Sequence, residues 1–518
     1  MSDMVVFGVF IALFVVFVAL GFYGAYWRKG DLSQMHEWAL AGRNLGTFLV
    51  WFLVGADLYT AYTFVAVPSS MWFTGAIYFF AVPYVALTFG IAMIVMPSLW
   101  KVAHEKNYIT AADFAKDKFQ SPTLGILVAI TGIVALLPYI ALQIVGMQAV
   151  LAVMFYQTSL SNIAGISISD IALVISFIIL AAFVFTSGLR GATLTAVMKD
   201  ILIFTTVIVV IIAVPLELLG GINGAAKAFS LAPTAYATLP SKFGNAYISL
   251  FILSALALYL YPHAVNGALS AKDVKKLRMS TALLPIYGIG LALLALFGIL
   301  VFAVPSALTL MANISHNDPT KAGIYVVPAL IQAATPDWFQ GIAFLGIFIG
   351  GLVPAAIMAM SQANLLVRNI VKEFKKNMSP ESETRWAKWA SVVFKFLALG
   401  FVFFVPATYA IELQLLGGIL IVQTLPPIFI GLYTKWENKY ALIIGWFGGI
   451  ISGLVLMWEA NGSKPLFNIK LTTSLFNTGQ PFGLLYVALV SLVINLILVV
   501  VLSFIFNLVM PNSKTPVK

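Results

Sequence analysis

The 518-residue sequence contains no cysteine. Disulfide bonds, thiolate nucleophiles and cysteine-bound metals or iron-sulfur clusters are therefore excluded. Charge is also scarce: Asp, Glu, Lys and Arg make up 9% of the residues, against about 25% in a soluble domain. So few charges cannot solvate the surface of a water-soluble protein of this length. Because 61% of the residues are hydrophobic, the composition indicates one integral membrane domain, and the lipid bilayer is its first predicted partner.

The apolar sequence carries no long polar insertion. The longest polar stretches are residues 305–337 and 372–388, which are too short for a kinase, a nucleotide-binding domain or a receptor domain. No glycine-rich phosphate loop ending in Lys-Ser or Lys-Thr is present, which argues against transport driven by ATP. Four scattered histidines argue against a metal site or an intramembrane enzyme. We therefore predict no enzymatic activity, no cofactor and no catalytic residue.

Thirteen segments fit the template of about 20 apolar residues for a membrane-spanning helix. The predicted spans are 4–26, 45–71, 75–99, 124–155, 168–185, 194–219, 246–263, 283–304, 339–364, 390–406, 413–433, 441–458 and 482–509. Tryptophans at span ends, namely Trp27, Trp72, Trp100 and Trp458, are expected to anchor at the membrane interface.

The basic residues predict the orientation of these spans. The loops after the odd-numbered spans, together with the C-terminus, hold 22 Lys and Arg residues, whereas the other loops hold five. Loops rich in Lys and Arg face the cytoplasm, so we predict an outside N-terminus and a cytoplasmic C-terminus in the plasma membrane. The net charge of +10 is thus explained by topology and anionic lipid. It indicates no nucleic acid and no obligate protein partner.

Two spans have interrupted interiors. The second contains Asp57 between Gly55 and Thr60, and the seventh ends with Pro262, His263 and Asn266. A proline removes a backbone donor, and a carboxylate in a membrane helix is expensive unless it faces a polar interior. Interruptions five spans apart predict an inverted repeat with a site near the midplane. Two simpler interpretations remain open: the proline only kinks its helix, and Asp57 only caps the second half of a broken one.

Four strings resemble the sodium:solute symporter family. They are residues 39–46 (ALAGRNLG), 187–190 (SGLR), 262–263 (PH) with 271–272 (AK), and 355–358 (AAIM). The resemblance covers nearly the whole chain and implies the leucine-transporter-type fold in a single transporter domain, residues 1–518. Its expected parts are a peripheral first helix (4–26), two five-helix inverted repeats (45–219 and 246–433) and two further helices (441–509).

Other strings are similar to the monocarboxylate uptake permease branch of that family. They are residues 199–202 (KDIL), 260–263 (LYPH), 283–285 (LLP), 351–354 (GLVP) and 364–369 (NLLVRN). The similarity implies lactate, pyruvate, propionate and, in some members, alanine as substrates.

The family pattern fails at the sodium site. The resemblance implies an ion bound by the backbone carbonyls of Gly55 and Leu58 and by two hydroxyl side chains, but the hydroxyl positions fall on Ala359 and Met360. A hard cation needs several oxygen ligands, so this site is predicted to be lost. Ser361 lies next to Met360, but at about 100° per residue it points elsewhere unless the register is shifted. The aspartate of a second sodium site in some members falls on Ala196.

Lys199 stands one turn after Ala196 and shares its helix face. Its ammonium could fill the space of the missing sodium. Burial disfavours the charged form of an amine, so Lys199 could also carry the coupling proton, with Asp57 and Asp200 assisting. Two alternatives stay open: the side chain extends into water, or it attracts a substrate carboxylate. If the Lys199 side chain extends into water, Asp200 could pair with Arg190.

A small carboxylate can bind at the positive ends of the half-helices. The residues predicted to line the substrate site are Gly55, Ala56, Leu58, Tyr59, Thr60, Gln143, Tyr261, His263, Asn266 and Gln362. For Gln143 a simple interhelical hydrogen bond is an equal interpretation, and His263 could serve only as a helix-end residue. Glu412 and Gln414 are expected to be solvated.

The sequence thus predicts a symporter that imports small monocarboxylates with protons by alternating access. The main alternative is a sodium-coupled symporter of the same family for an organic acid or amino acid. A channel and a substrate sensor are further alternatives, but we find no continuous polar stripe and no output domain.

Overall fold

The computed structural model describes residues 2–28, 30–156, 162–163, 166–402, 410–460, 472–473 and 484–510. These residues are mostly helical, so the predicted all-α class is confirmed. In the described part of the chain, paired strands are limited to two short antiparallel pairs. They are β1 (Asn162–Ile163) with β2 (Ile166–Ser167), and β3 (Thr472–Thr473) with β4 (Leu485–Tyr486).

Ten helical stretches within the described ranges are long and apolar enough to cross a membrane, and each overlaps a predicted span. They are Met4–Tyr23, Ala76–Glu105, Pro122–Phe155, Ile168–Ser187, Leu189–Leu218, Ser241–Leu258, Val274–Ala303, Asp337–Phe374, Lys439–Ala460 and Val487–Val509. The second and eleventh predicted spans match the shorter apolar helices Thr47–Ala56 and Ile411–Thr424. The count of thirteen spans stays a prediction.

The second predicted span is broken. It begins with α3 (Thr47–Ala56), turns through residues 57–60, and continues as η2 (Tyr62–Ala66) and α4 (Val67–Phe73). The seventh is broken between α12 (Gly244–Leu258) and α13 (Pro262–Leu269), where Tyr261 is extended. An extended residue before proline is expected, because the proline ring clashes with a helical predecessor. Both interruptions therefore lie where the sequence places them.

The remaining elements of the first half either precede the first break or lie between the two breaks. Before the first break come α1 (Ser2–Tyr23), α2 (Met35–Leu40) and η1 (Ala41–Arg43). After it follow η3 (Ala76–Phe80), α5 (Ala81–Glu105), α6 (Ala111–Lys118), α7 (Pro122–Phe155), α8 (Ile168–Ser187), α9 (Leu189–Ala213), η4 (Val214–Leu218), α10 (Ile222–Leu231), α11 (Thr234–Ala237) and η5 (Ser241–Phe243).

The second half continues from α13 to the end of the described chain. Its first elements are α14 (Val274–Leu283), α15 (Pro285–Leu300), η6 (Val301–Ala303), α16 (Pro305–Ile314), α17 (Pro319–Ala322), η7 (Gly323–Tyr325), α18 (Val326–Ala334) and α19 (Asp337–Leu365). They are followed by η8 (Leu366–Val371), α20 (Lys372–Phe374), α21 (Pro380–Val402), α22 (Ala410–Ile421), η10 (Val422–Thr424), η11 (Pro426–Ile430), α23 (Lys439–Ala460) and α24 (Val487–Val509).

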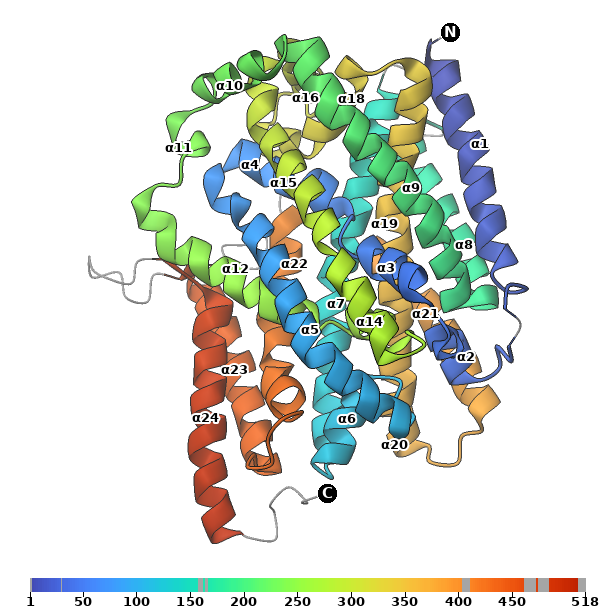
Figure 1. Cartoon of the computed structure of the whole chain (residues 1–518), viewed down its shortest axis with the longest axis vertical. Helices are drawn as coiled ribbons and strands as arrows, with labels where there is room; N and C mark the ends of the chain where they lie inside the picture. Colours follow the sequence, from blue (N-terminus) through green and yellow to red (C-terminus); the bar gives the residue numbers. More distant parts are fainter. Residues whose placement is uncertain are drawn as a thin grey trace.

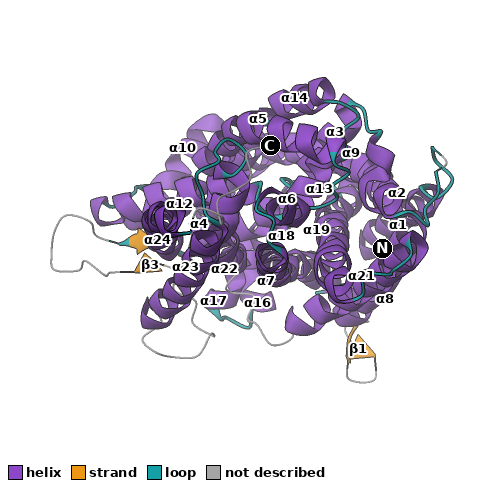
Figure 2. Ribbon diagram, turned by 90° about the horizontal axis from the view of Figure 1, so that it is seen from below, coloured by secondary structure: helices purple, strands orange, loops and turns teal. Residues whose placement is uncertain are grey.

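Helix α19 forms the centre of the bundle. It contacts α7, α9, α1 and α21, and nearly all its side chains are buried. Gly351 permits the close approach of α7, because a Cβ there would lie 2.6 Å from the carbonyl oxygen of Gln143. Figure 2 shows α19 inside the bundle, with α23 and α24 on one flank and α1 and α8 on the other. The helices broken at the two interruptions therefore meet a rigid, buried neighbour.

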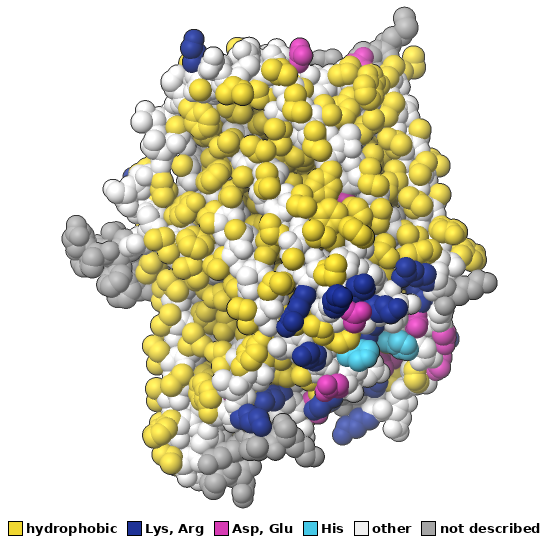
Figure 3. Space-filling model, viewed as in Figure 1, with side chains coloured by type: hydrophobic (Ala, Val, Ile, Leu, Met, Phe, Trp, Pro, Cys, Tyr) yellow, Lys and Arg dark blue, Asp and Glu magenta, His cyan; other side chains and the backbone are white. Residues whose placement is uncertain are grey.

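The charged side chains gather at one end of the molecule. On the face drawn in Figure 3, hydrophobic side chains cover the upper and middle parts, and Lys, Arg and His concentrate towards the lower end. Helix α1 begins at the opposite, upper end, and α24 ends at the lower end (Figure 1). An apolar belt with one basic end is what a membrane-embedded protein requires.

The tenth predicted span begins earlier in the structure. Helix α21 begins at Pro380, ten residues before the predicted span 390–406, so part of the polar stretch 372–388 is helical. The reason is that its charges pair with one another: Glu383 is buried and accepts from Arg368 (3.1 Å) and Lys372 (2.5 Å). Residues 403–406 of that predicted span, and the outer-loop lysines Lys464 and Lys470, lie outside the described residues.

Candidate functional site

The break after α3 changes the partners of the local backbone groups. The carbonyl of Gly55 accepts from the amides of Leu58 (2.9 Å) and Tyr59 (3.0 Å), which closes the last turn of the helix. The backbone amide of Ala61 donates instead to a side chain, the Oε1 of Gln143, at 3.1 Å. A helix end leaves carbonyls without backbone donors, and here these include the carbonyls of Ala56 and Tyr59.

The side chain of Lys199 fills this break. From α9, its Nζ donates to the carbonyl oxygens of Ala56 and Tyr59, each at 2.8 Å, and forms an ion pair with Oδ1 of Asp200 at 2.9 Å. Lysine and aspartate side chains are both 0% exposed. The two hydrogen bonds and the ion pair together compensate the ammonium for the hydration lost on burial. Figure 1 shows α3 and α9 side by side, and their residues are in contact.

The carboxylate of Asp200 has a second donor. The hydroxyl of Tyr287, on α15, donates to Oδ2 at 2.6 Å. Its ring lies against Gly55, where an added Cβ would come within 2.2 Å of the hydroxyl oxygen. Sequence reasoning missed Tyr287; the glycine at the break is the signal that a bulky neighbour must be accommodated there.

The carbonyls that Lys199 contacts each lie one residue after those expected to bind sodium, a role of Gly55 and Leu58 that stays a prediction. The carbonyl of Leu58 accepts from the hydroxyl of Thr63 at 2.6 Å, and that of Gly55 is used by the backbone, so the cation is held by Ala56 and Tyr59 instead. The alternative in which Lys199 extends into water is not observed, because the side chain is fully buried. The suggested partner of Asp200, Arg190, is paired with Glu37.

The positions at which sodium ligands are predicted to be missing are buried and apolar. Ala196, Ala359 and Met360 are all 0% exposed and offer no side-chain oxygen. Ser361 is engaged elsewhere, since its hydroxyl donates to the carbonyl of Ile357 (2.8 Å) and accepts from Asn266 (3.0 Å). In the ranges that the structure describes, no three His, Asp or Glu side chains form a group that could hold a metal ion.

Two buried polar side chains beside the breaks lack partners. Asp57 is 4% exposed and His263 is 0% exposed, and among the described residues neither side chain makes a hydrogen bond. The rings of Tyr139 and Tyr261 lie 5.5 and 5.6 Å from the imidazole, centroid to centroid. A buried polar group without a partner costs about 1–3 kcal/mol, and each such group in a native protein needs an explanation.

Five of the other predicted lining side chains are hydrogen-bonded, four of them to another helical segment and Thr60 within the break itself. Among the five, Gln143 holds the amide of Ala61, and the hydroxyl of Thr60 accepts from the amide of Tyr62 at 3.0 Å. The remaining donors are Tyr261 to the carbonyl of Gln414 (3.0 Å), Asn266 to Ser361 (3.0 Å) and Gln362 to the carbonyl of Ile133 (2.7 Å). The interhelical interpretation of Gln143 therefore describes its observed contact, and a role of these residues towards substrate stays a prediction.

Three surface predictions are wrong. Gln414 is 1% exposed, and Glu412 accepts from the hydroxyl of Tyr78 at 2.7 Å, so neither is fully solvated. Trp100 is buried and donates its indole N–H to the carbonyl of Ala271 at 2.9 Å, so it is not an interface anchor. In each case a neighbouring element covers a residue that the span prediction places at a boundary.

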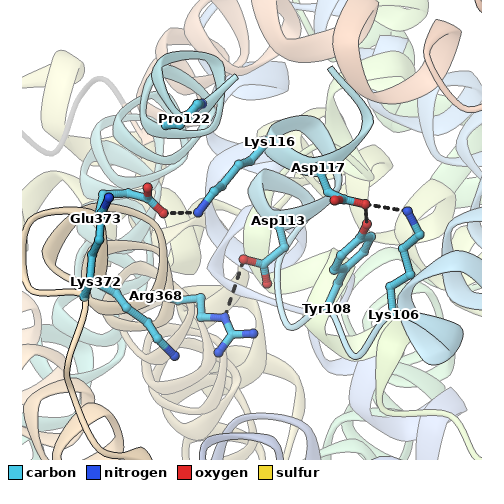
Figure 4. A pocket seen from close by; sticks show the side chains of 10 residues that line it. Lys106, Tyr108, Asp113, Lys116, Asp117, Pro122, Arg368, Lys372 and Glu373 are labelled. Carbon is cyan, nitrogen blue, oxygen red and sulfur yellow. Dashed lines mark hydrogen bonds and ion pairs between the residues drawn. The ribbon is translucent and has the colours of Figure 1, made fainter. Parts of the chain in front are cut away.

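A charged cavity of about 550 Å³ lies at the basic end (Figure 4). It is formed by the end of α5, by α6 and by the segment from η8 to α20. Ion pairs cross it from Lys116 to Glu373 and from Arg368 to Asp113. Hydrogen bonds from Lys106 and Tyr108 hold the pKa of Asp117 below its ordinary value. This cavity is separate from the break at Lys199.

The cap of α6 is tied to η8 above this cavity. The side chains of Thr110 and Asp113 form a capping box. Asn369 engages both: its Nδ2 donates to Asp113 Oδ1 at 2.7 Å, and its Oδ1 accepts from the hydroxyl of Thr110 at 2.8 Å. The first and second halves of the chain are therefore cross-linked at the basic end.

These features define a multi-pass helical membrane protein with broken helices and buried polar groups at its centre. The model of the sodium:solute symporter family matches residues 38–449. The chain therefore belongs to the sodium:solute symporter family and is a symporter for small solutes, not an enzyme.

Similar proteins agree with this assignment. The chain is 40% identical to a "Monocarboxylate transport permease protein" of Rhizobium johnstonii, over 98% of each chain. It is 34% identical to "Uncharacterized symporter YodF" of Bacillus subtilis, over 82% of each. A solved Na⁺-coupled sialic acid symporter matches with a TM-score of 0.72 at 14% identity, over 97% of this chain and 98% of the other. That similarity shows a shared fold, the predicted leucine-transporter-type fold.

Proposed function

We propose that this symporter imports small monocarboxylates together with protons, and that Lys199 carries the coupling proton. One observation carries the proposal: the ammonium of Lys199 occupies the break in α3, held by the carbonyls of Ala56 and Tyr59. Oxygen atoms of a broken helix are what an alkali cation needs. A covalently fixed amine cannot leave with the substrate, but it can release and regain a proton.

The assisting carboxyls have different surroundings. Asp200 forms an ion pair with the Lys199 ammonium and accepts from the Tyr287 hydroxyl, and both contacts favour its anionic form. Asp57 has no donor among the described residues, and an isolated buried carboxylate is too costly to persist. We therefore infer that Asp57 holds its own proton or meets a donor from the substrate. Coupling is assigned to Lys199 and Asp200, with Asp57 assisting.

The break between α12 and α13 is the proposed binding site for the substrate carboxylate. The N-terminus of α13 begins at Pro262 and presents a partial positive charge. Beside it the imidazole of His263 is buried without a hydrogen bond in the described structure. A small carboxylate such as propionate would satisfy the first feature, and one that also carries a hydroxyl, keto or amino group would satisfy both. Lactate, pyruvate, propionate and alanine are the proposed substrates, in agreement with the name of the Rhizobium relative.

Transport by alternating access would rock the two proposed repeats, residues 45–219 and 246–433, against each other. We place the basic end in the cytoplasm and the N-terminus outside, supported by the Lys and Arg side chains at the lower end of Figure 3. The membrane is then the plasma membrane, and the Figure 4 cavity opens to the cytoplasm.

The second candidate is a sodium-coupled symporter for an organic acid or amino acid. It is favoured by the family to which the chain belongs and by the description of the structural relative as Na⁺-coupled. It requires an ion bound without the two lost hydroxyl positions, Ala359 and Met360.

Purified protein in proteoliposomes distinguishes the two candidates. We expect labelled lactate uptake driven by an inward proton gradient in sodium-free buffer, abolished by an uncoupler and by Lys199→Met. Lys395→Met is the matched control, because Lys395 is also 0% exposed but donates to Ser391 (2.6 Å) on its own helix. We expect this control to keep proton-driven uptake. Uptake that requires a sodium gradient would refute proton coupling.

A further inference from the structure

We propose that Tyr287 is a positioning residue that links the movement of the second repeat to proton binding at Lys199 and Asp200. The inference rests on the proposed proton coupling. It assigns a role in that coupling to a residue outside α9, the helix that carries Lys199 and Asp200. Its observation is the 2.6 Å hydrogen bond from the Tyr287 hydroxyl to Asp200 Oδ2. The donor lies on α15 in the second half of the chain, and the acceptor lies on α9 in the first.

The tyrosine ring is held firmly in place. It is 1% exposed, and its centroid lies 4.7 Å from the ring of Tyr59, 4.9 Å from Phe204 and 5.3 Å from Trp51. Gly55 leaves the space for the hydroxyl, since a Cβ there would overlap it. The ring therefore contacts α3, the break and α9 together. A hydroxyl fixed in this way costs little additional ordering when it donates to Asp200.

Few other ionisable groups face the pair. From the break come Asp57 and Tyr59, and from α15 comes Tyr287 itself. The other helices in contact with α9 are α1, α2, α8, α18 and α19. The acidic and basic residues of α1, α8 and α19 lie in their first turns, and α18 has none. On α2, Glu37 is paired with Arg190, and His36 lies 3.6 Å from Glu37 with a side chain that is 44% exposed. Tyr287 is thus the donor through which a second-repeat helix acts on the pair.

The bond changes how strongly the pair holds a proton. A hydroxyl that donates to a carboxylate stabilises its anionic form. While the bond is present, the anionic form of Asp200 is favoured, and Asp200 competes less strongly for the proton of Lys199. When α15 moves away from α9, the carboxylate loses this donor and the pair holds its proton more tightly. Proton affinity therefore follows the relative position of the two repeats.

Tyr287→Phe tests the proposal, because it removes only the hydroxyl. We expect the pH at which proton-driven lactate uptake is half-maximal to rise by about one unit, the size expected for a hydrogen bond to a charged group. Lactate exchange at equal pH on both sides, which needs no net proton transfer, should persist. In an Asp200→Asn background, Tyr287→Phe should cause no further shift.

The matched control is Tyr486→Phe, in which a buried tyrosine loses a hydroxyl that donates to the carbonyl of Leu415 at 2.5 Å. This control should leave the pH profile unchanged. An unchanged profile in Tyr287→Phe, while the parent protein is proton-driven, would overturn the role of Tyr287 alone. Loss of exchange in Tyr287→Phe would show a purely structural role and would also overturn it. Sodium-driven uptake by the parent protein would overturn the proposed function itself.

Discussion

Replacing Lys199 by methionine keeps the length of the side chain but removes the ammonium from the break in α3. The Asp200 carboxylate then remains buried with a single donor, the hydroxyl of Tyr287 at 2.6 Å. The carbonyls of Ala56 and Tyr59 each lose a donor at 2.8 Å. Removing one partner of a buried ion pair costs about 3–5 kcal/mol. We therefore expect Lys199→Met to lower the free energy of unfolding by about 4 kcal/mol.

Replacing Asp200 by asparagine should lower the free energy of unfolding less than Lys199→Met does. In Asp200→Asn the ammonium of Lys199 keeps both carbonyl acceptors and can donate to the amide oxygen, so a loss of about 1–2 kcal/mol is expected. The double variant buries no charge at this position. It should therefore be more stable than Lys199→Met alone, which corresponds to a coupling energy of about 2 kcal/mol or more in a double-mutant cycle.

Unfolding of the four proteins in mixed micelles, titrated with sodium dodecyl sulfate and followed by tryptophan fluorescence, measures these differences. Lys395→Met is again the control for loss of a buried amine, and it should change stability little because no carboxylate is left unpaired. A double variant whose loss equals the sum of the two single losses would refute the reasoning, since it would mean that Lys199 and Asp200 do not interact.

Two further predictions concern contacts elsewhere in the polar core and at the basic end. Gly55→Ala should abolish proton-driven uptake and destabilise the protein by about 1–3 kcal/mol, because its methyl group would displace the Tyr287 ring. The control Gly8→Ala, with nothing within 4 Å of the new methyl group, should leave both uptake and stability unchanged. Asn369→Leu should lower the melting temperature measured in detergent, because it removes two hydrogen bonds to the α6 cap and leaves Asp113 with a lost donor. An unchanged melting temperature would show that the hydrogen bonds from Asn369 to the α6 cap do not stabilise the protein.

The two helix breaks could be predicted because their causes are local. Pro262 cannot donate a backbone hydrogen bond and forces the preceding residue to extend. Asp57 in an apolar span cannot face lipid. The alignment of Lys199 with the break followed from the family resemblance and from its helix face. The identity of the two carbonyls could not follow, because it depends on whether the last turn of α3 closes on Gly55.

The contacts that sequence reasoning missed are tertiary. Tyr287 is 87 positions from Asp200, and a tyrosine near the start of an apolar span carries no signal of its own. Glu412 was placed in water because it stands at a span end, but the folded chain brings Tyr78 against it. Such contacts depend on how helices far apart in the sequence pack, which periodicity does not specify.

In the proposed mechanism, the two breaks would have different roles in transport because their charges differ. At the α3 break, Lys199 and Asp200 form a pair with no net charge, so the protonated pair does not attract a substrate anion from a distance. The other break offers the positive end of α13, with no acidic side chain in α13 itself. Under the proposed function, the substrate carboxylate would therefore be drawn to α13 while the proton is held at the α3 break. Because Tyr287 joins α15 to α9, a movement between these helices would then change the hold on the proton, and such a link between two sites is what coupling requires.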